Sequence, residues 1–123
     1  MIEPLTYDAA EARDYFAKKI AFTLGPVELK DQIAESENIN IIDVREPEDY
    51  QQGHIPGALN LPHAQWDTFN GLHEDAMNIL YCYSATCHLA ATAAVKFSQK
   101  GFRVKEMEGG FEAWKQAGFQ IER

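Results

Sequence analysis

The residue with the clearest chemical potential is Cys82, which directly follows the apolar run 78–81 and precedes an alanine-rich stretch over 89–97. An apolar run, a short segment of small and polar residues and a helix-forming stretch together predict a strand, a tight loop and a helix. In α/β folds, chemistry lies at the carboxyl ends of strands. The loop N–H groups and the positive end of the next helix would stabilise a thiolate. The pattern therefore indicates a nucleophile, with a small buried core residue as the alternative.

A second thiol, Cys87, lies in the same loop and is followed by His88. Zinc would need a fourth ligand, and Cys82, Cys87 and His88 have none at usable spacing, so we expect no metal. Cys87 is either a resolving thiol that forms a disulfide with Cys82 or a small packed residue, depending on whether the two Cβ atoms point toward each other.

Asp43 and Arg45 lie at the end of the apolar run 39–44. A buried acid at a strand end can serve as a general base. We favour structural support instead: Asp43 is expected to hydrogen-bond loop backbone, and Arg45 to pair with Glu48 or Asp49, tying the strand to the following helix.

Strand and helix signals alternate along the chain, which is typical of an open α/β sheet with helices on both faces. Residues 63–77 have no clean period and are predicted as a loop with a helical turn or two. The expected strands are 39–44, 58–61, 78–81 and 103–107, and the expected helices are 7–21, 26–36, a short one from Glu46 to Gly53, 89–100 and 111–117.

Composition narrows the classes of function. The 123 residues suit one compact domain. Acids outnumber bases 19 to 11, the net charge is −8 and no basic stripe is present, so nucleic acid is not an expected partner. No apolar run approaches a membrane span and no leader is evident, so no membrane partner is expected. With two cysteines, a reducing, cytoplasmic location is predicted.

Several segments together resemble the rhodanese (sulfurtransferase) domain family. They occur in family order over about residues 24–119, and the matching segments are 42–50, 53–62, 81–82 and 108–114 with Gly118. The resemblance implies a five-stranded, mostly parallel sheet in a domain over 23–123, preceded by an N-terminal helical extension over 1–22. Cys82 matches the position of the family's sulfur-carrying cysteine.

The resemblance also implies a reaction. A Cys82 thiolate would take the outer sulfur of thiosulfate or a thiol persulfide and pass it to a thiophilic acceptor, a small thiol or a protein, with no cofactor. Substrate would be bound by the backbone N–H groups of the loop residues Tyr83, Ser84, Ala85, Thr86, Cys87 and His88. The alternative is a persulfide carrier or redox-responsive interaction module with little small-molecule turnover.

The loop side chains separate related activities. A phosphatase loop of similar kind needs Arg six positions after the cysteine, and His88 stands there, which disfavours a phosphatase. The loop contains no Lys or Arg, so thiosulfate is expected to be a weak donor.

The extension has its own apolar face, formed by Ala12, Tyr15, Phe16 and Ile20. This face must cover either the sheet of its own domain or another subunit, so the sequence leaves a homo-oligomer through this helix as one possibility.

Overall fold

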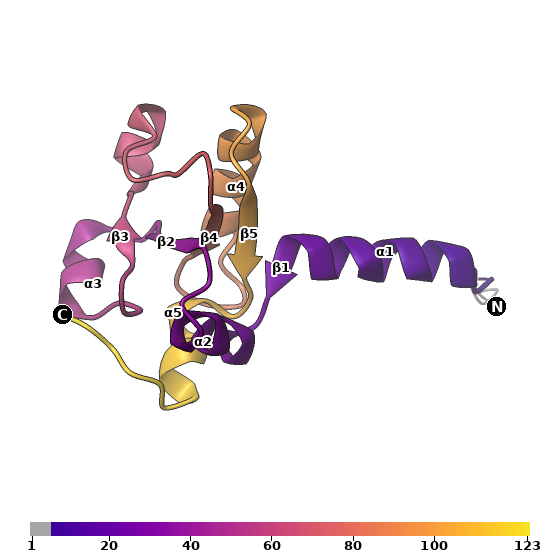
Figure 1. The fold of residues 1–123 in the computed structure, drawn as a ribbon, viewed down its shortest axis with the longest axis horizontal. Coiled ribbons are helices and arrows are strands. Elements are labelled where there is room, and N and C mark those ends of the chain that lie inside the picture. The colour runs from indigo at the N-terminus through magenta and orange to yellow at the C-terminus, as the bar shows by residue number, and fades with distance from the viewer. Residues whose placement is uncertain (1–5) are drawn as a thin grey trace, which may run out of the picture.

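The computed structural model describes residues 6–123 and contains one five-stranded sheet in the order β1-β5-β4-β2-β3, with all neighbouring strands parallel (Figure 1). The strands are β1 (Thr23–Leu24), β2 (Ile39–Asp43), β3 (Leu59–Asn60), β4 (Met77–Tyr81) and β5 (Val104–Met107). The helices are α1 (Ala9–Phe22), α2 (Pro26–Ala34), α3 (Pro47–Gln52), the 3-10 helix η1 (His63–Thr68), α4 (Leu89–Gln99) and α5 (Gly110–Gln116).

Local sequence explains where the helices begin. The carboxylate of Asp8 accepts hydrogen bonds from the N–H groups of Ala10 and Glu11 and caps α1. Proline occupies the first turn of both α2 and α3, where its missing N–H costs no hydrogen bond. The helix expected over 7–21 is therefore present, and Asp8 fixes where it begins.

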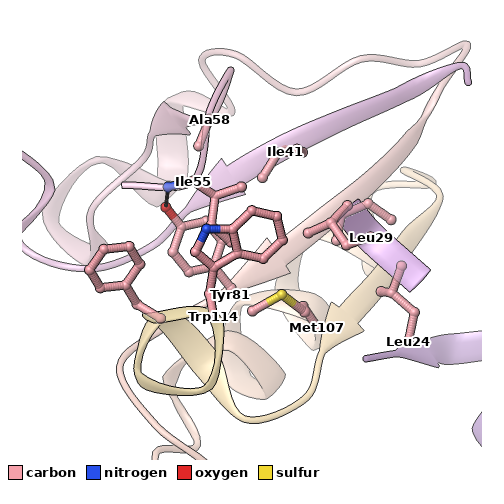
Figure 2. Packing of buried hydrophobic residues seen from close by; sticks show 10 residues of the cluster. Leu24, Leu29, Ile41, Ile55, Ala58, Tyr81, Met107 and Trp114 are labelled. Carbon is pink, nitrogen blue, oxygen red and sulfur yellow. Dashed lines mark hydrogen bonds between the residues drawn. The ribbon is translucent and has the colours of Figure 1, made fainter. Parts of the chain in front are cut away.

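The sheet separates two apolar clusters. On one face, α2 and α5 supply Leu29, Phe111 and Trp114, which pack with Tyr81 from β4 (Figure 2). On the other face, α4 and η1 cover the sheet, and Cys82 belongs to this second cluster. Because β2 and β4 are buried on both faces, their sequences are nearly continuous apolar runs, as predicted.

The structure confirms the α/β class, the parallel sheet and the N-terminal helix, and it adds β1. This strand has only two residues, Thr23 and Leu24, which pair with Glu106 and Met107 of β5. Two residues are too few to show an alternation of apolar and polar side chains, so nothing in the sequence indicated a strand there. Among the described residues, no helix combines the length and apolar character needed to cross a bilayer.

Candidate active site

The loop 82–88 leaves β4 at the centre of the sheet and ends at the first turn of α4. Within the loop, residues 84–87 form a turn in which the Cys87 N–H donates to the Ser84 carbonyl at 3.1 Å. From the other side, the N–H of Phe111 donates to the Cys82 carbonyl at 2.8 Å and that of Glu112 to the Tyr83 carbonyl at 3.0 Å. The first turn of α5 therefore fixes the beginning of the loop.

Gly110 allows this close approach. Its φ is +63°, and a Cβ added there would lie 2.5 Å from the Ser84 nitrogen and 2.6 Å from the Tyr83 carbonyl carbon. Both are backbone atoms that cannot rotate away. A glycine at this position is thus a requirement of the loop, a role that sequence reasoning did not assign.

The loop presents backbone donors that the protein does not use. In the part of the chain that the structure describes, no hydrogen bond involves the N–H groups of Ser84, Ala85, Thr86 or His88. Unused N–H groups in a tight loop before a helix attract anions. Four of the six predicted loop residues therefore offer a free N–H group to a substrate, whereas the Cys87 N–H is used within the loop.

The Tyr83 hydroxyl donates to the Asp49 carboxylate at 2.7 Å and accepts from the Glu46 N–H at 3.0 Å. Its ring is therefore tied to α3. The other loop side chains are partly or fully exposed at Ser84, Ala85, Thr86, Cys87 and His88, and the Ser84 and Thr86 hydroxyls are 3.2 Å apart.

The two thiols differ in exposure and acidity. Cys82 is 2% exposed, and its Sγ donates to the Cys87 carbonyl at 3.5 Å. Burial, and next the hydrogen bond with Cys87, raise the pKa of Cys82 to about 11, although the N–H groups of Ala90 and Tyr83 act in the opposite direction. The expected stabilisation of a resting Cys82 thiolate is therefore outweighed by burial.

The pKa of Cys87 is shifted in the opposite direction. Burial alone would raise its pKa, but hydrogen bonds from the Cys82 side chain and from the N–H groups of Leu89 and Tyr83 outweigh it, so its pKa is lowered. The Leu89 N–H lies 3.5 Å from the Cys87 Sγ. Of the two thiols, Cys87 loses its proton first.

Asp43 and Arg45 form a buried ion pair beneath the site. The Arg45 guanidinium donates to the Asp43 carboxylate at 2.8 Å and to the Gly53 carbonyl at 2.6 Å. The prediction that Arg45 pairs with Glu48 or Asp49 is wrong, because Asp49 is the acceptor of Tyr83 and the buried Asp43 is nearer. Asp43 also accepts from the Arg45 N–H and from the Tyr81 hydroxyl, so the pair supports the ends of β2 and β4.

A hollow of about 410 Å³ adjoins the loop at Tyr83. Its other lining residues come from the segment that follows β2 and from α5, namely Arg45, Phe111, Glu112, Lys115 and Gln116. Lys115 brings an exposed positive charge to this side of the loop. The sequence did not reveal it, because Lys115 lies 28 positions after the last thiol of the loop.

Within residues 6–123, no group of three His, Cys, Asp or Glu side chains is arranged to hold a metal ion. The donors available near Cys82 are N–H groups, which bind anions. One acid, Glu106, lies near Cys87 and His88, and burial raises the pKa of its carboxyl.

Comparison with known proteins gives the same fold and chemistry class. A thiosulfate sulfurtransferase, GlpE, of Pseudoalteromonas translucida is 36% identical over 70% of this chain and 82% of its own length. An HTH-type transcriptional regulator of Mycobacterium tuberculosis is 36% identical over 72% of this chain, and the chain spans only 39% of that protein. A solved Bacillus halodurans protein is 36% identical with a TM-score of 0.86 and covers 94% of this chain and 86% of its own.

The Bacillus halodurans structure matches 94% of this chain, which is more than residues 23–123 contain. The match therefore extends into α1. The rhodanese-like domain model itself matches residues 25–117 and includes the Cys82 loop and the α5 residues that hold it. By this match and by its relatives, the chain belongs to the rhodanese-like domain family.

Proposed function

We propose that the chain is a sulfurtransferase that carries sulfane sulfur on Cys82 between a donor and a thiol acceptor. The observation that supports this most is that, among the described residues, the N–H groups of Ser84, Ala85, Thr86 and His88 have no acceptor in the loop that follows the buried Cys82 at the end of β4. Such a loop stabilises negative charge on a sulfur bonded to Cys82. The sulfurtransferase relative supports the same reaction class.

Loading requires a proton transfer. The Cys87 thiolate can accept the Cys82 proton, but because the pKa of Cys87 is the lower of the two, this transfer is uphill and proceeds only as the Cys82 sulfur forms its bond to the donor. The Cys82 sulfur bonds to the outer sulfur of the donor, and the donor's S–S bond breaks. A thiol persulfide releases its thiolate, and thiosulfate releases sulfite with the electron pair. The outer sulfur remains on Cys82 as a persulfide.

Unloading reverses the roles. An acceptor thiolate attacks the outer sulfur, the Cys82–sulfur bond breaks, and the Cys82 thiolate recovers a proton. The acceptor leaves as a persulfide. The loop offers no Lys or Arg to an anionic donor, and Lys115 lies across the neighbouring hollow, so a thiol persulfide is the favoured donor over thiosulfate.

Intact-mass measurement tests the proposal. The parent chain and Cys87→Ser should each gain one sulfur atom from glutathione persulfide and return to the starting mass with excess thiol. Cys82→Ser should gain none on the same time scale. Sulfur bound at the parent rate by Cys82→Ser would refute the assignment of Cys82.

A second candidate is a redox-responsive or persulfide-sensing module, which is favoured by the adjacency of Cys82 and Cys87 and by the regulator among the relatives. In this function, Cys87 attacks the inner sulfur of the Cys82 persulfide, a Cys82–Cys87 disulfide forms, and sulfide leaves with the Cys87 proton. The chain acts on a protein partner and turns over few small molecules.

Mass again separates the two functions. Excess glutathione persulfide should make the parent two hydrogens lighter in the second function, reversibly with dithiothreitol, while Cys87→Ser accumulates persulfide. Identical behaviour of parent and Cys87→Ser, with sustained transfer to thiol, leaves the sulfurtransferase as the function and Cys87 as a packed residue with no part in proton transfer.

A further inference from the structure

Helix α1 exposes an apolar face to solvent. No residue of α1 is buried, and its large apolar side chains Tyr15, Phe16, Ile20 and Phe22 are between 55% and 74% exposed. Figure 1 shows the helix extending away from the sheet, so it covers neither face of its own domain. Isolated helices of this length are marginal in water, because most helix stability in proteins comes from packing of an apolar face. A partner surface is therefore required.

The helix cannot fold back to supply that surface itself. Phe22 is followed directly by Thr23 of β1, which pairs with β5, and no loop residue separates the two elements. The Thr23 hydroxyl donates to the Lys19 carbonyl, and the Lys19 ammonium lies 3.7 Å from the Glu108 carboxylate. The direction of α1 is thus set by the sheet.

An apolar groove lies beside the root of the helix. Its volume is about 670 Å³, and its floor and walls come from α4, the β5 edge and the end of α1. The apolar lining residues are Ala91, Ala94, Val95, Phe102, Val104 and Phe22. Val95 is 59% exposed in this groove, which is a high value for a valine on a helix that covers the sheet. One molecule therefore carries both an uncovered helix face and an uncovered groove.

We propose that the groove receives α1 of a second copy of this chain, so that two chains form a symmetric dimer with exchanged helices. Each groove lies at the C-terminal end of its own α1, since Ala21 and Phe22 line it. Two α1 helices of about 21 Å packed antiparallel therefore bring the N-terminal half of each to the partner's groove. The contact is isologous and closed, as in most homodimers.

Charge is complementary in this arrangement. The N-terminal half of α1 and its Asp8 cap carry three exposed acids, Asp8, Glu11 and Asp14, against one base, Arg13. The groove that this half would meet is lined by two bases, Arg103 and Lys105, and one acid, Glu106. Acids of one copy thus meet bases of the other, whereas a parallel pairing of the helices would bring Lys18 and Lys19 together with those bases.

The area is sufficient for a dimer. Aromatic side chains present roughly 150–250 Å² each when fully exposed. At the exposures given above, the apolar face of one α1 offers on the order of 400 Å². Two helices and two matching grooves then bury about 1,600 Å², which is a standard size for a specific interface. This inference does not depend on the sulfur chemistry.

The first test is the oligomeric state of the full chain by sedimentation velocity, with a helix variant, Phe16→Asp, and a groove variant, Val95→Asp. The parent should sediment as a dimer, and both variants as monomers with parent-like circular dichroism. Ala10→Asp is the matched control, because it adds the same charge to an exposed position of the same helix, about 120° around the axis from Phe16, and should remain dimeric.

The second test identifies the occupant of the groove. A photoreactive phenylalanine analogue at position 12, on the apolar face of the N-terminal half of α1, should give a cross-linked product of twice the chain mass, with the cross-link mapped to peptides from 91–106 of the other chain. A parent that is monomeric at all concentrations, a dimer that survives both aspartate variants, or a cross-link confined to α1 would each overturn the proposal.

Discussion

The contact between Gly110 and the Cys82 loop gives a prediction whose size follows from the coordinates. Gly110→Ala adds one methyl group at φ +63°, a backbone region that costs an alanine about 1–2 kcal/mol relative to glycine. The new Cβ would also lie 2.5 Å from the Ser84 nitrogen. Because that atom is backbone, the loop must move.

The two costs can be separated with a second glycine. Gly118 has φ +78° and no atom within 4 Å of an added Cβ, so Gly118→Ala carries the backbone cost alone. Overpacking adds about 1–3 kcal/mol at Gly110. We therefore expect Gly118→Ala to lower the free energy of unfolding by about 1–2 kcal/mol and Gly110→Ala by about 2–5 kcal/mol.

Urea unfolding gives these free energies, and intact mass after glutathione persulfide gives the rate of Cys82 loading. Gly118→Ala should load at the parent rate, because it lies outside the loop. Gly110→Ala should load more slowly even where it is fully folded, since the displaced Ser84 N–H belongs to the proposed anion cradle. Equal destabilisation and equal loading of the two variants would refute the argument that Gly110 shapes the loop.

Three further predictions concern charge. Asp43→Asn leaves the buried Arg45 guanidinium without its counter-ion and should lower the free energy of unfolding in urea by about 3–5 kcal/mol. Asp67→Asn removes the acid of an exposed pair with Lys96 and should change the free energy of unfolding little. Equal effects of the two variants would contradict burial as the cause. Thr86→Arg should lower the KM for thiosulfate several-fold while Thr86→Gln does not, and no difference would contradict the charge argument. Iodoacetamide should label Cys87 before Cys82, and labelling of Cys82 should still increase as the pH approaches 11. The reason is that a pKa raised from 9.0 to about 11 leaves Cys82 with about 100-fold less thiolate at pH 7 than an unperturbed cysteine. Labelling in the reverse order would contradict this.

The strands and the loop start that position Cys82 could be predicted from local sequence. Buried parallel strands leave apolar runs, so the runs 39–44 and 78–81 predicted the two central strands, and the change to small polar residues after Tyr81 predicted where the loop begins. The position of Cys82 at a strand end followed from those two signals. The helix caps and first-turn prolines are equally local.

The remaining features depend on contacts between segments far apart in the chain. The approach of Gly110 to Ser84 joins residues 26 positions apart and is set by where α5 packs on the sheet. The pairing of Arg45 with Asp43 depends on the direction in which the strand end turns, which alternation alone does not specify. The uncovered face of α1 depends on its direct connection to β1, a strand too short to predict.

The raised pKa of Cys82 and the unused loop donors become consistent when the loaded and unloaded states are compared. In the unloaded chain, the Cys82 thiol is buried and donates a hydrogen bond to the Cys87 carbonyl, and burial disfavours the charged thiolate. Within residues 6–123, the N–H groups of Ser84, Ala85 and Thr86 have no acceptor, so they are available to an anionic atom bound at the loop. In the proposed cycle that atom is the outer sulfur of the persulfide. The proposed role of the loop is therefore to stabilise the loaded anion more than the resting thiolate, and we expect this difference to favour sulfur transfer from donor to protein.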